Sequence, residues 1–293
     1  MRMISIVERL ESKNYEVKVA GGGPGEKFLR ERGRSPFSPT TTDTRRNLEK
    51  NLFSAALYQL TDPLSRIKEL EEWIALEDPE VILTDDPPAI IAARKQSKDF
   101  YYLNHGSKSI LGNRLEGWLN WVANKLIVRA AEEFFYPSVW DDEEPKGAEV
   151  VGPLAPEGNE EVEGFDILIV PSEFDSGQDW ESIKENLDEY GVRLVGGDDW
   201  DIKESLQPYI READVVVCSG YSTIMEAAVA GTSCIIAPAT SEQRGIAEVL
   251  DGYKGFRKFS GDIRKDISEV EDPEPMGNGA DKIADIIDKD LSE

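Results

Sequence analysis

The chain has little histidine and cysteine, and each shortage excludes a class of protein. One histidine and two cysteines, Cys218 and Cys234, are too few for a zinc cluster or a disulfide framework in 293 residues. No stretch reaches the roughly 18 apolar residues of a membrane span, and the start lacks the charged and then apolar layout of a signal peptide. Both cysteines lie in apolar runs, so we expect buried free thiols in a cytoplasmic protein, with peripheral association at a membrane left open.

Basic residues are also scarce. The chain has 33 Lys and Arg against 58 Asp and Glu, a formal net charge of -25 at pH 7. Nucleic acid is therefore excluded as a partner, because its phosphates would be repelled. The acidity is spread along the chain, which suits either plain solubility or molar salt, where screening shortens repulsion to about 3 Å. We favour the second interpretation, which predicts unfolding on dialysis into dilute buffer.

Hydrophobic residues make up 40% of the chain, which indicates a folded protein. Short β-branched runs alternate with longer amphipathic stretches, which is typical of βαβ units and parallel sheets. The expected fold class is α/β, with two doubly wound, Rossmann-like domains of parallel sheet that face a cleft. The expected strands are residues 15–20, 80–84, 99–104, 133–136, 149–151, 166–170, 192–195, 214–218 and 233–237.

Helices are expected between the strands, where apolar residues recur three and four positions apart. The clearest are residues 48–60, 64–76, 113–131 and 279–291. The run from Pro153 to Gly164 interrupts both periodicities with Pro156 and Gly158, and it predicts a hinge linker. The predicted organisation is a first domain at 1–155, a second domain at 163–275, and a final helix within 276–293 that packs back on the first domain.

The start of the chain departs from the usual order of a doubly wound domain. Such a domain opens with a strand whose glycine-rich turn feeds the first helix, whereas residues 3–10 predict an amphipathic helix at once. We therefore expect the first strand and its turn to be missing. Four glycines within residues 21–25 lack the Gly-x-Gly-x-x-Gly spacing, so they predict a loop and no phosphate-binding turn.

The segment 213–250 carries the strongest candidate site. A buried strand is expected to end at Cys218, the turn Ser219-Gly220 follows, and a helix begins near Tyr221. That order leaves backbone N–H groups and the hydroxyls of Ser222 and Thr223 at a helix N-terminus, where the partial positive charge favours phosphate.

Glu226 lies one turn into the same helix. A carboxylate at this place is able to accept two hydrogen bonds from a ribose diol, as the acidic residue of dinucleotide-binding folds does. The simpler alternative is that Ser219 to Thr223 form an ordinary helix cap and that Glu226 is an exposed helical residue.

This segment resembles the C-terminal donor domain of GT-B glycosyltransferases, especially the family 28 group that includes the lipid-linked GlcNAc transferase of peptidoglycan synthesis. That group has a Ser-Gly turn, Thr and Glu on the next helix, a glycine turn, a strand that ends in Pro, and a loop with Gln. The matching residues are Ser219, Gly220, Thr223, Glu226, Gly231, Pro238 and Gln243. Ser233 stands where the turn usually has proline.

The resemblance implies a nucleotide sugar, most often a UDP-sugar, as the donor substrate, and neither a metal nor another cofactor. It implies that Ser222 and Thr223, after the Ser219-Gly220 turn, lie at the diphosphate and Glu226 at the ribose. Two further sets of residues are implied at the donor: Glu242 and Gln243 at the sugar, and Ser172, in the loop after the first strand of the second domain, at the phosphates.

The first half resembles archaeal and bacterial GT-B enzymes that open with a strand, a Gly-x-Gly-His loop and a helix carrying Met-Arg. Met1, Arg2 and the helix that follows match the part just after that loop, so the histidine that is the usual base in those enzymes is not in this sequence. Two alternatives are open: the true start lies upstream, or the base is elsewhere. Two residues after expected strands are the remaining candidates for the base, Asp85 and His105. Asp86, before Pro87, is expected to be a helix N-cap.

The resulting hypothesis is a glycosyltransferase that moves a sugar from a nucleotide donor to a hydroxyl with inversion. The second domain holds the donor, and the first binds an acceptor whose identity is open and which includes lipid-linked carriers. Two alternatives stay open. One is an enzyme similar to UDP-GlcNAc 2-epimerase, which shares the fold. The other is a non-catalytic donor-binding subunit, suggested by the missing loop.

Overall fold

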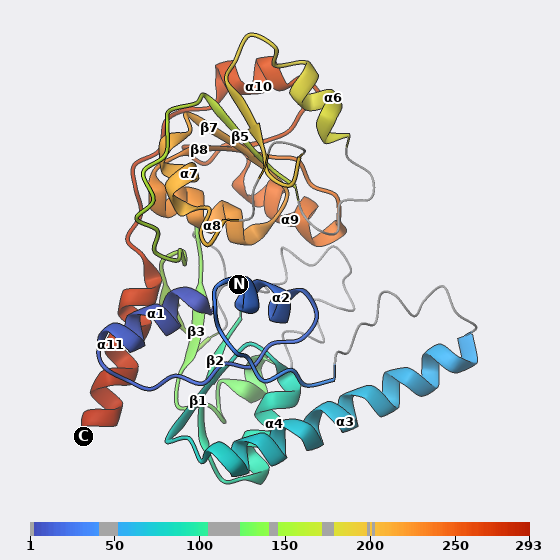
Figure 1. The fold of residues 1–293 in the computed structure, drawn as a ribbon, viewed down its shortest axis with the longest axis vertical. Coiled ribbons are helices and arrows are strands. Elements are labelled where there is room, and N and C mark those ends of the chain that lie inside the picture. The colour runs from blue at the N-terminus through green and yellow to red at the C-terminus, as the bar shows by residue number, and fades with distance from the viewer. Residues whose placement is uncertain are drawn as a thin grey trace.

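A computed structural model gives the arrangement of the chain (Figure 1). It describes residues 3–40, 52–104, 124–140, 146–171, 179–197, 200 and 203–293, without the side chains of residues 24 and 52–62. The described strands form two parallel sheets, one of four strands in the N-terminal half and one of five in the C-terminal half. The fold class is therefore α/β, as predicted. Among the described residues, no helix is long and apolar enough to cross a membrane.

The C-terminal sheet has the strand order β6-β5-β7-β8-β9, and all of its pairs are parallel. The chain adds β6 on one side of β5 and then β7, β8 and β9 on the other side. The crevice beyond the carboxyl ends of β5 and β7 is therefore the topological switch point of the sheet. The strands are β5 (Ile167–Val170), β6 (Val192–Leu194), β7 (Val215–Cys218), β8 (Ser233–Ile236) and β9 (Phe256–Lys258).

Alternating side chains of this sheet pack against helices on both faces. Val216 and Cys218 face one layer of helices, while Val215 and Val217 face the other. The first layer is α7 (Gln207–Glu212), α8 (Tyr221–Ala230) and α9 (Ser241–Leu250). The second layer is α6 (Trp180–Glu185) and α10 (Ile263–Glu269), which lie on the opposite side of the sheet in Figure 1.

The N-terminal sheet has the order β1-β2-β3-β4, again parallel. Its strands are β1 (Val81–Thr84), β2 (Asp99–Leu103), β3 (Phe134–Pro137) and β4 (Glu149–Val151). One face packs on α4 (Pro87–Lys95), and the other packs on α1 (Ile4–Ser12) and α11 (Gly279–Ser292). Two further helices lie beside it, α2 (Pro24–Glu31) and α3 (Leu52–Glu77), the latter running to the edge of the molecule in Figure 1.

The two halves share one continuous hydrophobic core. Ile6 of α1, Tyr101 of β2 and Ile283 of α11 belong to the same cluster of buried side chains as Val216 of β7 and Ile224 of α8. The linker residues between the sheets form no helix or strand from 152 to 164, where the sequence predicts the hinge. Helix α11 follows the second sheet and packs against α1 and β4, so the end of the chain returns to the first half (Figure 1).

Several predicted elements differ from the structure. Residues 15–20 are extended, but they form a single bridge, between Ala20 and Phe37, because no second strand lies alongside to complete a ladder. The two predicted helices at 48–60 and 64–76 are one helix, α3, which continues through Pro63. Strand β9 was not predicted, because its three residues are too few to show the alternation of a strand. Most of the predicted helix at 113–131 lies outside the described residues.

Candidate functional site

The Ser219-Gly220 turn lies where the sequence predicts it, between the carboxyl end of β7 and the first residue of α8. This is one side of the switch point. Gly220 is the N-cap of α8, and no side chain caps the helix. The alternative of an ordinary helix cap is confirmed in the position of the cap, but the cap is Gly220 and no side chain makes a cap bond. The first turn of α8 carries Thr223, which is buried, and Ser222, which is partly exposed, and the N-terminus of a helix favours an anion.

Glu226 is partly buried as a residue, and one oxygen of its carboxylate is shielded, so the alternative of an exposed helical residue is wrong. Its Oε2 atom is shielded from solvent and has no hydrogen-bond partner. Burial of the charged form raises the pKa of this carboxyl to about 7, against a lowering by the nearby Arg32 guanidinium. A buried carboxylate oxygen without a partner is costly in a folded protein, so this oxygen is a strong candidate for a ligand contact.

Two residues that the sequence did not single out accompany Glu226. Gln207, at the start of α7, is buried and donates through Nε2 to the backbone oxygen of Glu226 at 3.5 Å, while its own Oε1 has no partner. Arg32 follows α2 in the N-terminal half, and its Nε is buried without a partner. The sequence did not indicate Arg32, because residues 21–25 predicted only a loop and the helix that ends just before Arg32 was therefore not predicted. Helix α2 begins at Pro24 within them, and Gly23-Pro24 is an ordinary helix-start signal.

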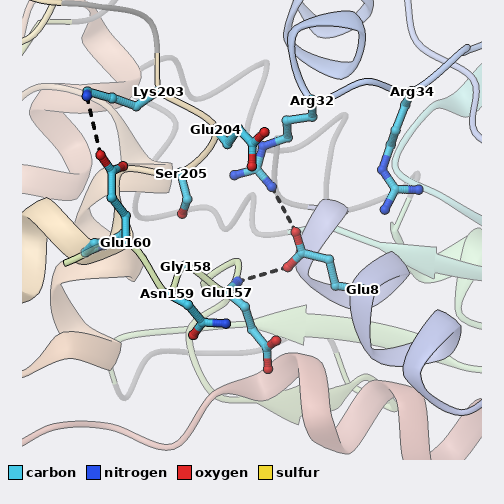
Figure 2. Close-up of a pocket in the computed structure, with 11 residues that line it drawn as sticks. Glu8, Arg32, Arg34, Glu157, Gly158, Asn159, Glu160, Lys203, Glu204 and Ser205 are labelled. Carbon is cyan, nitrogen blue, oxygen red and sulfur yellow. Dashed lines mark hydrogen bonds and ion pairs between the residues drawn. The ribbon is translucent and has the colours of Figure 1, made fainter.

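A pocket with a volume of about 540 Å³ lies between the two halves at this place (Figure 2). Four segments line it: α1, the residues after α2, the linker, and the residues that lead into α7. The lining residues are Glu8, Arg32, Arg34, Glu157, Gly158, Asn159, Glu160, Lys203, Glu204, Ser205 and Pro208. The lining contains three cations, Arg32, Arg34 and Lys203, and four carboxylates, Glu8, Glu157, Glu160 and Glu204. The pocket is therefore charged without being uniformly negative.

Glu242 and Gln243 lie in the first turn of α9, after β8. The Gln243 side chain completes a capping box: its Oε1 accepts from the backbone N–H groups of Ala239 at 2.8 Å and Thr240 at 2.9 Å. The backbone N–H of Gln243 donates in return to the Thr240 hydroxyl at 3.2 Å. Gln243 therefore holds the start of α9, and its Nε2 is the part of the side chain left for a sugar contact.

Asp85, a candidate base of the first half, lies at the carboxyl edge of its sheet, with Asp86 next to it. Asp85 directly follows β1 and is exposed. Asp86 occupies the N-cap position before Pro87, as predicted, but makes no cap bond and instead accepts from Arg66 Nε at 2.7 Å. Burial raises the pKa of the Asp86 carboxyl, and Arg66 opposes the rise. His105 and Ser172 lie outside the described residues.

Cys218 and Cys234 are free and fully buried, as predicted, with their sulfur atoms 3.6 Å apart. Within the described part of the chain, no three His, Cys, Asp or Glu side chains are grouped to hold a metal ion.

Tyr221, the first residue of α8, joins the site to the first half of the molecule. Its hydroxyl donates to the backbone oxygen of Pro137, at the end of β3, at 3.0 Å. Its ring lies 5.4 Å from that of Trp140. Both aromatic side chains are buried. The start of α8 is therefore fixed against the carboxyl end of β3, which brings the carboxyl ends of the two sheets toward each other across this contact.

Comparisons with known proteins agree with this architecture. No protein-family model and no curated protein sequence matches the chain. Among solved structures, it is similar to the glycosyltransferase of kitacinnamycin, with a TM-score of 0.64, 16% identity, and coverage of 98% of this chain and 94% of that one. It is also similar to the Streptomyces sp. SF2575 glycosyltransferase SsfS6 in complex with thymidine diphosphate, with a TM-score of 0.62, 13% identity, and coverage of 99% and 96%.

A third similar structure is a Listeria monocytogenes protein assigned as a UDP-N-acetylglucosamine 2-epimerase, with a TM-score of 0.56, 14% identity, and coverage of 99% and 93%. The fold of this chain is therefore that of GT-B glycosyltransferase structures. At this identity the similarity defines the fold, which proteins with different activities share.

Proposed function

We propose that the protein is a glycosyltransferase that takes its sugar from a nucleoside diphosphate donor held by the C-terminal half. The observation that carries the proposal is the buried Oε2 oxygen of Glu226, which has no hydrogen-bond partner and lies one turn into helix α8, at the switch point of a doubly wound sheet. Ligands of such sheets bind in this crevice. The bound thymidine diphosphate of the similar SsfS6 structure supports a nucleoside diphosphate as the ligand class.

Each part of this site has a distinct chemical role in the proposal. The N–H groups at the start of α8, with the hydroxyls of Ser222 and Thr223, neutralise the diphosphate as it departs from the sugar. They are neutral donors, which suits a chain of net charge -25 that must offset its own repulsion of a diphosphate locally. Glu226 accepts hydrogen bonds from the ribose hydroxyls, and this restores the partner that its buried oxygen lacks.

The acceptor hydroxyl is placed by the N-terminal half in this proposal. A base removes the proton of that hydroxyl while its oxygen attacks the anomeric carbon from the face opposite the diphosphate, so the configuration inverts. Asp85, at the carboxyl end of β1, and His105 are the candidates for the base. Glu242, the Nε2 of Gln243, and Ser172 complete the proposed set of donor contacts.

Thermal stability in the presence of nucleotides tests the donor site. UDP, TDP and their sugar conjugates are expected to raise the melting temperature, and Glu226→Ala is expected to abolish the rise. Glu248→Ala, on the exposed side of α9, is the matched control and is expected to keep it. Absence of a shift with every nucleoside diphosphate would contradict the proposal.

Product analysis then distinguishes transfer from the two alternatives. Transfer yields a glycoside when a hydroxyl acceptor is added. An epimerase releases N-acetylmannosamine from UDP-GlcNAc without any acceptor. A donor-binding subunit shows the thermal shift but no turnover in either assay.

A further inference from the structure

Three buried polar atoms without hydrogen-bond partners come from both halves of the molecule. They are Arg32 Nε, Gln207 Oε1 and Glu226 Oε2. One belongs to Arg32, which lines the pocket, and the other two belong to Gln207, which lies between the lining residues Ser205 and Pro208 in the chain, and to Glu226, whose backbone oxygen accepts from Gln207. Arg32 lies close enough to Glu226 to lower the pKa of its carboxyl, yet the two side chains form no ion pair. A buried guanidinium and a buried carboxylate that are near each other but unpaired leave room for a ligand that offers an acceptor to one and a donor to the other.

Arg32 is held in place before any ligand arrives. Its Nη1 donates to Glu8 Oε1 at 2.8 Å, and its guanidinium lies 4.8 Å from the centre of the Phe28 ring. The other oxygen of Glu8 accepts from the backbone N–H of Glu157 at 2.9 Å, which ties this pair to the linker (Figure 2). The Arg32 side chain is only 9% exposed. Such fixed geometry reduces the entropy lost on binding.

The position of the pocket relative to α8 decides which part of a nucleotide Arg32 meets. The diphosphate belongs at the first turn of α8, and Glu226 lies one turn further along. Gln207 joins Glu226 to the loop 203–208, which forms one wall of the pocket, and Figure 2 shows the Arg32 guanidinium directed toward that loop. A nucleotide whose diphosphate lay at the first turn of α8 and whose ribose lay at Glu226 would bring its base to this wall of the pocket, within reach of Arg32.

We propose that Arg32 is a donor-binding residue contributed by the N-terminal half, and that its guanidinium donates to a carbonyl oxygen of the nucleotide base while Gln207 and Glu226 accept from the ribose hydroxyls. This inference rests on the proposed function, since it assumes a nucleoside diphosphate at α8. It assigns base selection to the N-terminal half: bases with a carbonyl group, such as uracil and thymine, satisfy Arg32, and adenine does not.

Arg34 provides a matched control from the same pocket. Its guanidinium is fully engaged with Glu11 through two parallel bonds of 2.7 Å, from Nη1 to Oε1 and from Nη2 to Oε2. A bidentate pair of this kind leaves little capacity for a ligand. The two arginines therefore carry the same charge and line the same pocket, but they differ in whether a donor is left without a partner.

The test measures the dissociation constants of UDP, TDP and ADP by calorimetry for the wild type, Arg32→Met and Arg34→Met. The wild type is expected to prefer UDP and TDP to ADP. Arg32→Met is expected to weaken UDP and TDP binding by about tenfold and ADP binding by less than about twofold, as for loss of a hydrogen bond from a charged donor. Arg34→Met is expected to keep the wild-type preference.

Arg32→Met leaves Glu8 without its cation, so the double variant Arg32→Met/Glu8→Gln is measured beside it. Glu8→Gln alone is expected to keep the preference for UDP, because the amide oxygen still accepts from the Glu157 N–H. An equal loss for all three nucleotides, or no loss for any, in both Arg32 variants would overturn the assignment of Arg32 to the base. Failure of the wild type to bind any of them would instead contradict the proposed function itself.

Discussion

The two halves of the molecule have the same kind of sheet but expose different chemistry at its carboxyl edge. In the C-terminal half, β7 is fully buried and leads through two residues into α8. The Glu226 Oε2 atom on this helix is buried and has no hydrogen-bond partner. In the N-terminal half, β1 is a partly exposed edge strand, and Asp85 after it is open to solvent. A buried polar atom without a hydrogen-bond partner is unusual and suggests a ligand contact, whereas an exposed polar group is satisfied by water. The C-terminal half, which holds the donor in the proposed function, therefore offers more evidence of a ligand site than the N-terminal half.

The two halves are also in contact at this place, so the site is not confined to the C-terminal half. Tyr221 is the first residue of α8 and its hydroxyl also donates to the end of β3, and Arg32 of the N-terminal half lines the pocket between the halves. In the proposed function the donor site is thus assembled from both halves, although the Ser-Gly turn and Glu226 lie in one. The following experiments test whether the C-terminal half binds the donor and the N-terminal half supplies the base, in order of decreasing expected effect.

The largest effect is expected from Asp85→Asn. If Asp85 is the base, the amide cannot accept the hydroxyl proton, so kcat falls by about 100-fold to 10,000-fold, while the dissociation constant of the donor changes little. Asp99→Asn, an exposed aspartate at the opposite end of the sheet, serves as the control. Retention of kcat in Asp85→Asn, with loss in His105→Ala, would assign the base to His105 instead.

Glu226→Gln is expected to change how stability depends on pH. The folded protein holds the Glu226 proton up to about pH 7, whereas the unfolded chain releases it near 4.5, the ordinary pKa of a glutamate. Stability therefore falls as pH rises between these values, by at most about 3 kcal/mol. Glutamine removes that fall, so without nucleotide the variant is expected to exceed the wild type in stability at pH 8.

Urea unfolding of both proteins at pH 5 and pH 8 measures this difference, with Glu248→Gln as the exposed control. A parallel pH dependence in wild type and Glu226→Gln would show that the carboxyl is not buried in its charged form. Binding of a nucleotide sugar at pH 8 should weaken in the same variant, because the carboxylate accepts hydrogen bonds that the amide accepts less strongly.

Tyr221→Phe separates the contact between the halves from the donor site. The change removes the hydroxyl that donates to the Pro137 backbone oxygen and leaves that buried acceptor without this partner, so we expect a loss of about 1 to 2 kcal/mol in the free energy of unfolding. Tyr253→Phe, at an exposed tyrosine, should cost almost nothing. Equal stability of the two variants in urea would show that the hydroxyl contact contributes nothing to the apposition of the sheets.

The smallest effects concern Gln243, where two substitutions separate a structural role from a sugar contact. Gln243→Ala is expected to lower stability by about 1 kcal/mol through loss of the capping box, while Gln243→Glu keeps an oxygen for the Ala239 and Thr240 N–H groups and costs less. Reduced transfer activity in Gln243→Glu at unchanged stability would place the Nε2 group at the sugar. Full activity in that variant would limit Gln243 to the cap.

Most of the regular structure of the second half was predictable. Strands β5 to β8 lie within one residue of the predicted bounds, because buried parallel strands are short β-branched runs bounded by turn residues. The turn Ser219-Gly220 and the end of α8 at Gly231, where φ is 73°, follow from the same local signals. The first half was harder: residues 15–20 have the alternation of a strand but form only one bridge, since a ladder also needs a neighbour.

The scarcity of basic residues and of histidine and cysteine, the α/β class and the position of the donor turn were determined by the sequence itself, since composition, periodicity and helix starts are local properties. Tertiary structure decided that the Oε2 oxygen of Glu226 is buried without a partner and that the Oε1 oxygen of Gln243 is engaged in a helix cap. It also brought Arg32 to the same pocket as residues 203–208, about 170 positions further along the chain. Burial and unmet hydrogen bonds depend on which distant segments pack together, and no local pattern records that.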